Sequence, residues 1–363
     1  MDSTIRNICR DFKIPGKYIS YEEITVGNVN KTYKVNFRDE NGNVKSYVVQ
    51  QLNTYVFRKP TQVMENIEKI TEYIRIKKPE EPSLHFHHTL DRKTYIHDTT
   101  GFWRLFNFIP SFTCDVCDDL KLVTSAGEAF GEFQMLLSDF DASTLYETIP
   151  DFHNTIKRYE TLEHDAKDDP CGRVKEVKRE LDWLFSVKEK ACKMTEMKNA
   201  GLLPLRVTHN DTKINNVLFD KETKKALTVI DLDTVMSGLV GHDFGDAIRS
   251  AANYVAEDSK EYDKAGVNLD IFKAFANGFI SKTAHTLTEN ELSTLALGGF
   301  VLACEQAVRF ADDYITGDKY YKTLYPEHNL IRTRCQIALA KDMLEKMDMM
   351  NDIVHNIAEK YLK

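Results

Sequence analysis

The alternation of apolar and polar residues in the first hundred positions predicts short strands that flank one helix. Apolar and polar side chains alternate over Tyr33–Phe37, as they do in a half-buried strand. Asp39–Asn43 is then a turn signal, and the apolar run Ser46–Gln50 predicts the answering strand. A helix is predicted over Thr61–Lys77, where apolar residues recur at helical spacing, namely Val63, Ile67, Ile70 and Ile74.

Two further patterns complete this first unit. Ile24–Tyr33 is typical of a strand, a turn around Gly27 and a second strand. Tyr95–Ile96 and Phe102–Pro110 predict two more strands after the helix. The predicted order is therefore three strands, a helix and two strands.

The chain after Leu120 is predicted to be mostly helical. Over Ala126–Leu137 the apolar residues lie on one helical face. His164–Arg173 is charged and contains Pro and Gly, which predicts a loop, whereas Val174–Ala200 predicts an amphipathic helical region. Met343–Met350 predicts an amphipathic helix whose apolar side packs against the rest of the chain.

The segment Val207–Phe219 carries the pattern that indicates chemistry. His209 precedes Asp211 by two positions and Asn216 follows Asp211 by five, which is the H-x-D-x-x-x-x-N spacing of kinase catalytic loops. A polar turn and a second apolar run then lead to Asp231. The two apolar runs, Val217–Phe219 and Leu227–Ile230, predict a hairpin that ends at Asp231.

Phosphoryl transfer gives each of these side chains a predicted role. It needs a base for the acceptor hydroxyl, a divalent cation on the phosphates and positive charge near the moving group. Asp211 is the candidate base, and Asn216 and Asp231 offer the oxygen ligands that Mg²⁺ prefers. Lys213 is placed to face the moving phosphoryl group, and we expect His209 to brace the loop through hydrogen bonds to backbone. The alternative is a solvated turn before a hairpin, which would not need all of these residues together.

Composition restricts the class of protein further. The chain has 363 residues, 42% hydrophobic and 29% charged, with a net charge of −8. This length favours two lobes, and the acidic balance disfavours nucleic acid or an anionic membrane as partner. We expect no apolar stretch long enough to span a membrane, no secretory signal at the N-terminus and, from seven cysteines without framework spacing, a reduced cytoplasmic setting.

These observations predict an α+β, bilobal, protein-kinase-like fold. Residues 1–110 would form a small β-rich N-lobe that binds the nucleotide, and residues 111–363 a larger, mostly helical C-lobe that carries the catalytic and substrate-binding residues. The hinge between the lobes would bind ATP largely through backbone groups, at Phe106, Asn107, Phe108 and Ile109. A monomer or weak dimer is expected.

Several segments resemble the aminoglycoside phosphotransferase/choline kinase-like superfamily and, within it, bacterial N-acetylhexosamine 1-kinases. The resemblance covers most of the chain. The segments that carry it are Val207–Val217, Val229–Gly238, Asp243–Arg249, Arg309–Tyr320 and the helix Ala126–Phe133.

The resemblance implies ATP- and Mg²⁺-dependent phosphorylation of the anomeric hydroxyl of N-acetylglucosamine or N-acetylgalactosamine. Carried over by position, Asp211 is similar to the base, Asn216 and Asp231 to the Mg²⁺ ligands, and Arg309 and Tyr320 to sugar contacts. Asn28 aligns with a sugar-contacting histidine of those kinases, so it is a further candidate substrate contact. On the chain alone, Arg309 forming an ion pair with Asp312 or Asp313 is an equally good interpretation, and Tyr320 is open to interpretation as a packing residue.

The chain also departs from the kinase pattern. The third strand of a kinase N-lobe carries a Lys or Arg that holds the phosphates, but this chain has Gln50 and Gln51 there. Glu65 or Glu68 on the following helix would therefore lack its strand partner. Lys31, Arg58, Lys59 or the Mg²⁺ ions are the candidates for the missing charge, and Gly27 is the one glycine in the phosphate-covering loop.

Three other functions compete with the sugar kinase. A kinase for another small alcohol, such as an amino alcohol, a different sugar or an aminoglycoside, fits the same motif. A nucleotide-binding pseudokinase scaffold would explain the missing strand cation but not the retention of Asp211, Asn216 and Asp231. A protein kinase is disfavoured because Asp231–Asp233 reads Asp-Leu-Asp and no A-P-E-like element follows it.

Overall fold

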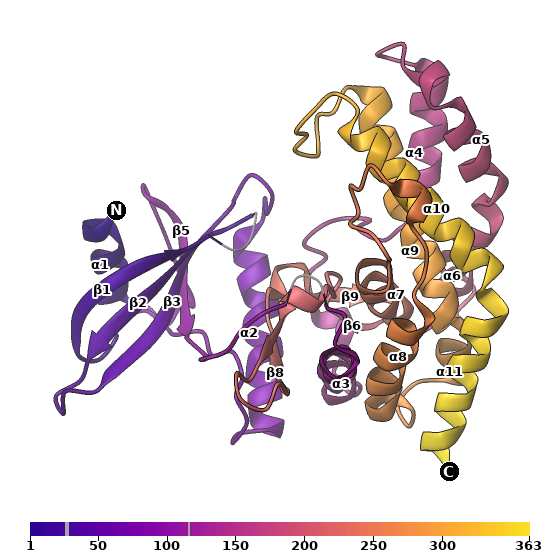
Figure 1. Cartoon of the computed structure of the whole chain (residues 1–363). Helices are drawn as coiled ribbons and strands as arrows, with labels where there is room; N and C mark the ends of the chain where they lie inside the picture. The colour runs from indigo at the N-terminus through magenta and orange to yellow at the C-terminus, as the bar shows by residue number, and fades with distance from the viewer. Residues whose placement is uncertain (26–28, 115–116) are drawn as a thin grey trace.

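The computed structural model describes residues 1–25, 29–114 and 117–363, and it has two lobes (Figure 1). The N-lobe consists of a five-stranded antiparallel sheet and two helices. Its elements are α1 Asp2–Asp11, β1 Lys17–Ile24, β2 Lys31–Arg38, β3 Val44–Leu52, α2 Pro60–Lys77, β4 Tyr95–Asp98 and β5 Gly101–Asn107. The predicted order of three strands, a helix and two strands is thus confirmed.

The sheet has the strand order β1-β2-β3-β5-β4, and its two faces are different. On one face Tyr33, Val49 and Leu105 are directly opposed across three strands and are buried. Side chains of α1 cover this face and close a small core. On the other face Thr32, Gln50 and Arg104 are opposed in the same way, and they line the cleft between the lobes.

The helix α1 was not predicted, although its pattern is present in the sequence. Ile5, Ile8, Cys9 and Phe12 have helical spacing, and all four are buried against the sheet. The predicted turn around Gly27 lies at residues 26–28, outside the described residues.

The C-lobe is mostly helical, as predicted. Its helices are α3 Leu120–Leu136, α4 Thr155–Asp168, α5 Lys178–Ser186, α6 Lys188–Asn199, α7 Val240–Ala251, α8 Leu269–Thr283, α9 Glu289–Thr316, α10 His328–Glu345 and α11 Met347–Leu362. Short strands form two antiparallel pairs, β6 Arg206–Thr208 with β9 Met236–Gly238 and β7 Val217–Phe219 with β8 Ala226–Val229. The second pair is the predicted hairpin.

Two predicted boundaries in this lobe are wrong. The expected loop at 164–173 begins later, because α4 continues to Asp168, and Asp169, which follows it, has a left-handed backbone. The predicted helical region 174–200 is confirmed, and it is divided at Val187 into α5 and α6. The methionine-rich segment is divided at Lys346, although Met343, Met347 and Met350 are buried as expected.

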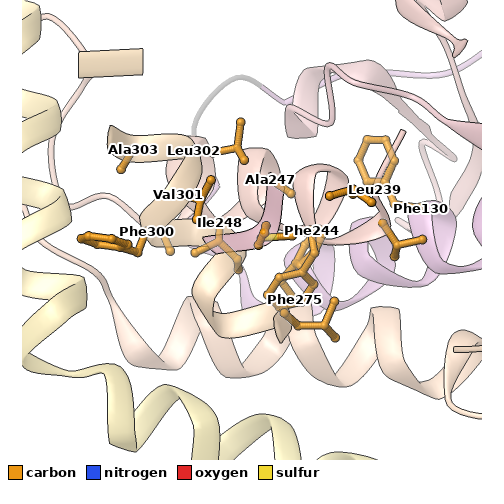
Figure 2. Packing of buried hydrophobic residues seen from close by; sticks show 14 of the residues in the cluster. Phe130, Leu239, Phe244, Ala247, Ile248, Phe275, Phe300, Val301, Leu302 and Ala303 are labelled. Atoms are coloured by element: carbon orange, nitrogen blue, oxygen red, sulfur yellow. The ribbon is translucent and has the colours of Figure 1, made fainter. Parts of the chain in front are cut away.

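Helix α9 lies at the centre of the C-lobe core, where it packs against α7 and α10. Figure 2 shows Phe244 of α7 and Phe275 of α8 pointing into this core beside residues of α9. By length and composition α9 is apolar enough to cross a membrane, contrary to the expectation that no such stretch exists, but 83% of its apolar window is buried inside the lobe. Its apolar residues are therefore those of a core helix.

The contact between α7 and α9 is close enough to require glycine. A Cβ atom on Gly245 would lie 2.3 Å from the carbonyl oxygen of Gly298, and one on Gly298 would lie 2.1 Å from that of Gly241. Because both obstacles are backbone atoms, the helices would have to separate to admit a side chain. This contact sets the position of α7, which carries residues of the site.

Candidate active site

The catalytic loop predicted at 209–216 is fixed to α7 by one buried carboxylate. Asp243 Oδ1 accepts a hydrogen bond from the Asn210 amide at 2.8 Å, and Oδ2 accepts from the His209 amide at 2.8 Å. Gln134 of α3 donates to Oδ2 as well, at 2.7 Å. Burial raises the pKa of Asp243, and these donors oppose the shift. In the sequence, Asp243 stood out only as part of Asp243–Arg249, one of the segments that resemble the kinase superfamily. Its role as the anchor of the catalytic loop was not predicted.

His209 braces the loop, as predicted. Its side chain is buried, and Nε2 lies 2.8 Å from the carbonyl oxygen of Ile230. A carbonyl oxygen only accepts, so Nε2 carries the proton and Nδ1 is free to accept from the Asp211 amide at 3.3 Å. The ring therefore ties the loop to the end of the hairpin.

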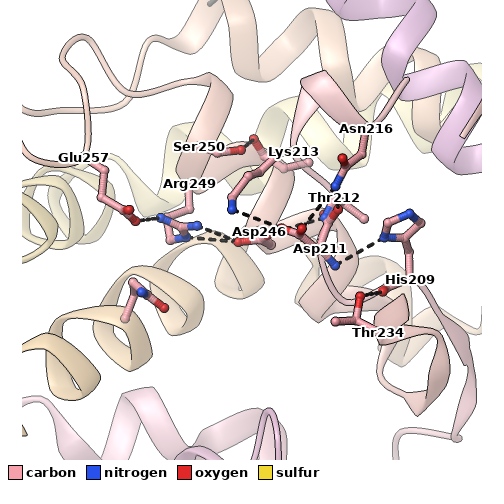
Figure 3. A network of polar contacts seen from close by, with 12 residues as sticks. His209, Asp211, Thr212, Lys213, Asn216, Thr234, Asp246, Arg249, Ser250 and Glu257 are labelled. Atoms are coloured by element: carbon pink, nitrogen blue, oxygen red, sulfur yellow. Dashed lines mark hydrogen bonds and ion pairs between the residues drawn. The ribbon is translucent and has the colours of Figure 1, made fainter. Parts of the chain in front are cut away.

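Asp211, Lys213 and Asn216 meet at the mouth of this loop (Figure 3). Lys213 Nζ is 3.2 Å from Asp211 Oδ1, and Asn216 Nδ2 donates to Asp211 Oδ2 at 3.1 Å. The Asp211 carboxylate raises the pKa of Lys213, so its ammonium group is charged at neutral pH. The structure thus brings together the predicted base, the predicted cation and one predicted metal ligand.

Asp231 lies next to Asn216 because the Ile230 amide donates to the Asn216 carbonyl oxygen at 2.8 Å. Its backbone is left-handed, with φ of 60°, and so is that of Asn210, with φ of 64°. Asp231 lines the cleft and its side chain is exposed to it, although protein atoms crowd the carboxyl group. Burial, followed by the charges of Asp233 and Asp211, raises the pKa of Asp231 to about 7. A divalent cation would relieve this repulsion.

The donor set fits a magnesium ion that is shared with phosphate. The Asn216 amide nitrogen is used on Asp211, so the amide oxygen is the end that can reach a cation. Asn216 and Asp231 both line the cleft, and one or two protein oxygens beside phosphates and waters are the usual environment of Mg²⁺. Among the described residues no group of three or more His, Cys, Asp or Glu side chains can hold a metal alone.

The cleft between the lobes forms a cavity of about 380 Å³. All four predicted hinge residues, Phe106 to Ile109, line it, and so do Asn216 and Asp231. Its apolar walls include Ile24, Val48, Leu84, Phe86, Leu218, Ile230 and Leu232. A flat aromatic base between apolar walls, with its phosphates near Asp231, suits these dimensions.

The cation missing from the third strand is present on a different strand. Arg104 of β5 donates to Gln50 Oε1 from Nε at 2.9 Å and from Nη2 at 2.6 Å, and it forms a buried ion pair with Asp233. Of the candidates proposed from the sequence, Lys31, Arg58 and Lys59 are not among the described residues that line the cleft. Arg104 was missed because nothing in its local sequence marks it.

The helix α2 is connected to the catalytic segment without a glutamate ion pair to β3. Its buried Asn66 donates to the carbonyl oxygens of Val235 at 3.0 Å and Tyr146 at 2.8 Å. Glu68 faces His88, whose Nε2 lies 2.8 Å from Glu68 Oε1. His88 belongs to no strand, so among the described residues Glu68 lacks a partner on β3, as expected, and pairs with a loop histidine instead.

Arg309 and Tyr320, the predicted sugar contacts, lie together on the C-lobe. The Arg309 guanidinium is 5.6 Å from the ring centre of Phe152, 5.8 Å from that of Tyr320 and 5.5 Å from that of Tyr321. Tyr320 is 70% exposed, which excludes the alternative of a packing residue. The segment between α9 and α10 that carries it projects toward the side on which the N-lobe lies (Figure 1). Asn28, the third candidate contact, lies outside the described residues.

The alternative ion pair of Arg309 is wrong. Within the described residues Arg309 pairs with neither Asp312 nor Asp313, and its Nη1 donates to Gln306 Oε1 at 3.0 Å. Asp313 instead accepts from the backbone amides of residues 319–321, at 2.7 to 3.0 Å. It thereby fixes the segment that presents Tyr320.

A chain of polar contacts leads from the catalytic loop along α7. The Thr212 amide donates to Asp246 Oδ2 at 3.1 Å, and Asp246 Oδ1 accepts from Arg249 Nη2 at 2.8 Å. Arg249 also pairs with Glu257 (Figure 3). The loop is therefore tied through Asp246 and Arg249 to the segment that follows α7.

Comparison with known proteins agrees with this geometry. A model of the Phosphotransferase enzyme family matches residues 20–274. The structure is similar to an aminoglycoside phosphotransferase from Alicyclobacillus acidocaldarius, with 10% identity, coverage of 97% and 96% of the two chains, and a TM-score of 0.62. It is also similar to a choline kinase from Cryptosporidium parvum, with 14% identity, coverage of 96% and 97% of the two chains, and a TM-score of 0.56. An ethanolamine kinase from Plasmodium vivax is similar as well, with 12% identity, coverage of 88% and 82%, and a TM-score of 0.54. At these identities the likeness shows the fold, and it confirms the predicted bilobal kinase-like architecture.

Proposed function

The chain belongs to the phosphotransferase enzyme family, and we propose that within this family it transfers the γ-phosphoryl group of ATP to the anomeric 1-hydroxyl of an N-acetylhexosamine. The family and the fold make it a small-molecule phosphotransferase of the aminoglycoside phosphotransferase and choline kinase type. The amino-sugar acceptor is the part that remains to be tested.

In the proposed reaction Asp211 is the base. Its carboxylate takes the proton of the sugar 1-hydroxyl while O1 bonds to the γ-phosphorus and the bond to the β,γ-bridging oxygen breaks, which releases ADP. Lys213, 3.2 Å from Asp211, holds positive charge where the phosphoryl group moves. Because Lys213 and Asn216 both contact the Asp211 carboxylate, its orientation is fixed before the substrate arrives.

Asn216 and Asp231 would hold Mg²⁺, which supplies charge neutralisation on the phosphates when bound. The adenine ring would lie against the hinge at Phe106–Ile109, which lines the same cavity. This arrangement places the γ-phosphate next to the catalytic loop.

The observation that carries the choice of acceptor is the environment of Arg309. Three aromatic rings, those of Phe152, Tyr320 and Tyr321, already face a guanidinium group at 5.5 to 5.8 Å. Aromatic walls recognise a cationic acceptor such as choline by offering free ring faces to the cation. Here the cation belongs to the protein, and a guanidinium can donate to several hydroxyl or acetamide oxygens at once. The wall therefore favours a neutral, oxygen-rich acceptor.

Most of the carboxylates near Arg309 are already paired, which supports the same choice; Asp312, which lines the same pocket, is not among the paired ones. Asp246 and Glu257 are paired with Arg249, Asp318 with Arg173, and Asp313 is used on backbone amides. A cationic aminoglycoside or amino alcohol would need carboxylates that are not already neutralised.

A panel of acceptors tests the proposal. Initial rates of ADP release would be measured with Mg²⁺-ATP and N-acetylglucosamine, N-acetylgalactosamine, choline, ethanolamine or an aminoglycoside. We expect kcat/KM for an N-acetylhexosamine to exceed that of any amine by at least about a hundredfold, the scale on which a site rejects a ligand that leaves its polar groups unpaired.

Two results would contradict it. Turnover confined to an amino alcohol would make the chain a kinase of the alternative type. Binding of ATP without turnover of any acceptor would favour the scaffold.

A further inference from the structure

Arg104 lies in the cleft face of the N-lobe sheet, a position that the sequence around it does not indicate. It is directly opposite Gln50 in the pairing of β3 with β5, and Gln50 is directly opposite Thr32 in the pairing of β2 with β3. Opposed residues of an antiparallel sheet point to the same face. All three therefore point into the cleft, which they line. Arg104 is thus one strand away from the place where a kinase N-lobe carries its phosphate-binding cation.

The guanidinium is held rigidly in this position. Gln50 Oε1 accepts from Nε and Nη2, while the Gln50 amide donates to Thr32 Oγ1 at 2.9 Å. On the other side the pair with Asp233 is almost fully buried, with side chains 3% and 2% exposed. Asn30 also donates to Asp233 Oδ2, at 2.7 Å. The orientation of Arg104 is therefore determined from both strands and from the segment after Asp231.

The charge balance of the cleft requires such a group. Of the described residues that line the cavity, Arg104 is the one Lys or Arg, and Asp231 is the one Asp or Glu. The polyphosphate of a nucleotide carries several negative charges and needs cationic donors in addition to Mg²⁺. Lys213 contacts Asp211 and is not among the described residues that line this cavity.

A contribution to stability explains the buried ion pair of Arg104 with Asp233 less well than phosphate binding does. A buried ion pair is often no more stable than apolar side chains of similar volume. Here Arg104 of the pair lines the cleft that Asp231 also lines.

We propose that Arg104 holds the α- and β-phosphates of the bound nucleotide from β5, in place of the third-strand cation, and that Gln50 and Asp233 position it. The proposal rests on the proposed use of ATP but not on the identity of the acceptor.

The test compares two ligands that differ only in phosphate. Dissociation constants of ADP with Mg²⁺ and of adenosine would be measured by calorimetry for the wild type and for Arg104→Gln. We expect the Kd of ADP to rise by about tenfold to a hundredfold, the scale of hydrogen bonds to charged groups, with that of adenosine within about twofold. If Arg104 had only a structural role, the substitution would weaken the binding of ADP and of adenosine to a similar extent.

A matched rescue uses the register of the sheet. In the double variant Gln50→Arg with Arg104→Gln the cation returns to β3, directly opposite its original position. We expect the double variant to bind ADP at least about tenfold more tightly than Arg104→Gln does, because the positive charge again faces the phosphates. The variant Arg104→Gln with Asp233→Asn leaves no unpaired buried charge, so it shows whether the loss of affinity follows from misfolding.

Three outcomes would overturn the proposal. They are an unchanged Kd of ADP in Arg104→Gln, an equal loss of ADP and adenosine binding, and recovery of ADP affinity when Asp233→Asn is added to Arg104→Gln. Failure of the wild type to bind ADP would overturn both this proposal and the use of ATP. Absence of turnover on N-acetylhexosamines, with phosphate-selective binding intact, would overturn the acceptor alone.

Discussion

At Asp211 both carboxylate oxygens have partners, Lys213 on Oδ1 and Asn216 on Oδ2. These contacts orient the carboxylate toward its position in the loop, and a base must be oriented in this way. The variant Asp211→Asn keeps the shape and the contact from Asn216 but cannot take a proton. We expect kcat to fall by about two to four orders of magnitude, with ATP binding retained. The same substitution at Asp352, an exposed residue of α11, is the matched control. A loss of ATP affinity in Asp211→Asn would assign Asp211 to ATP binding.

Asp231 gives a prediction about metal dependence. Of the two proposed Mg²⁺ ligands, Asp231 is the one with a carboxyl group. The variant Asp231→Asn should therefore weaken the binding of Mg²⁺ more than the binding of the nucleotide base. We expect the Mg²⁺ concentration for half-maximal activity to rise by at least about tenfold, measured by titration at saturating ATP. An unchanged titration curve would remove Asp231 from the ligand set.

Arg309 gives a prediction about substrate recognition. Replacing it with Met keeps most of the length of the side chain and removes the charge and the donors. We expect KM for the acceptor to rise by about tenfold to a hundredfold while KM for ATP stays constant. Arg309→Lys should be intermediate, because it retains the charge but loses the planar donors. An equal rise in both KM values would make the residue structural.

At the scale of elements, the position of the catalytic loop depends on how closely α7 approaches α9. Asp243 and Asp246 of α7 hold the loop amides, and Gly245 between them contacts the backbone of Gly298. Gly245→Ala places a methyl group where only 2.3 Å is available. We expect the free energy of unfolding to fall by about 1–3 kcal/mol in urea titrations, with reduced kcat. Ser250→Ala, at an exposed position of the same helix, should change it by less than about 0.5 kcal/mol. Equal stability of the two variants would show that α7 has room to move.

Elements with their own local pattern were predictable from the sequence, and those defined by distant contacts were not. The catalytic loop and hairpin lie within 25 residues of each other, so spacing and apolar flanks identify them. Arg104 is 54 residues from Gln50 and 129 from Asp233, and only the folded sheet brings the three together. The breaks at Val187 and Lys346 have no Pro or Gly to mark them, and the helices on both sides of each break contact α9. By contrast, α1 had a readable helical pattern.

At the scale of the whole molecule, the two lobes divide the proposed work. The cleft face of the N-lobe sheet supplies Gln50 and Arg104, and the C-lobe supplies the base, the metal ligands and the Arg309 wall. The contacts of Arg104 with Asp233 and of Asn66 with the Val235 carbonyl oxygen cross from one lobe to the other. Gln50 and Arg104 of the N-lobe and Asn216 and Asp231 of the C-lobe therefore line one cavity although they are far apart in the sequence.

The most direct test of the acceptor is the identity of the product. Enzyme, Mg²⁺-ATP and N-acetylglucosamine or N-acetylgalactosamine would be incubated, ADP release followed, and the product examined by phosphorus NMR. We expect stoichiometric ADP and a sugar phosphate whose phosphorus couples to the anomeric proton. Phosphate on any other hydroxyl, or no turnover of either sugar while another alcohol is phosphorylated, would contradict it.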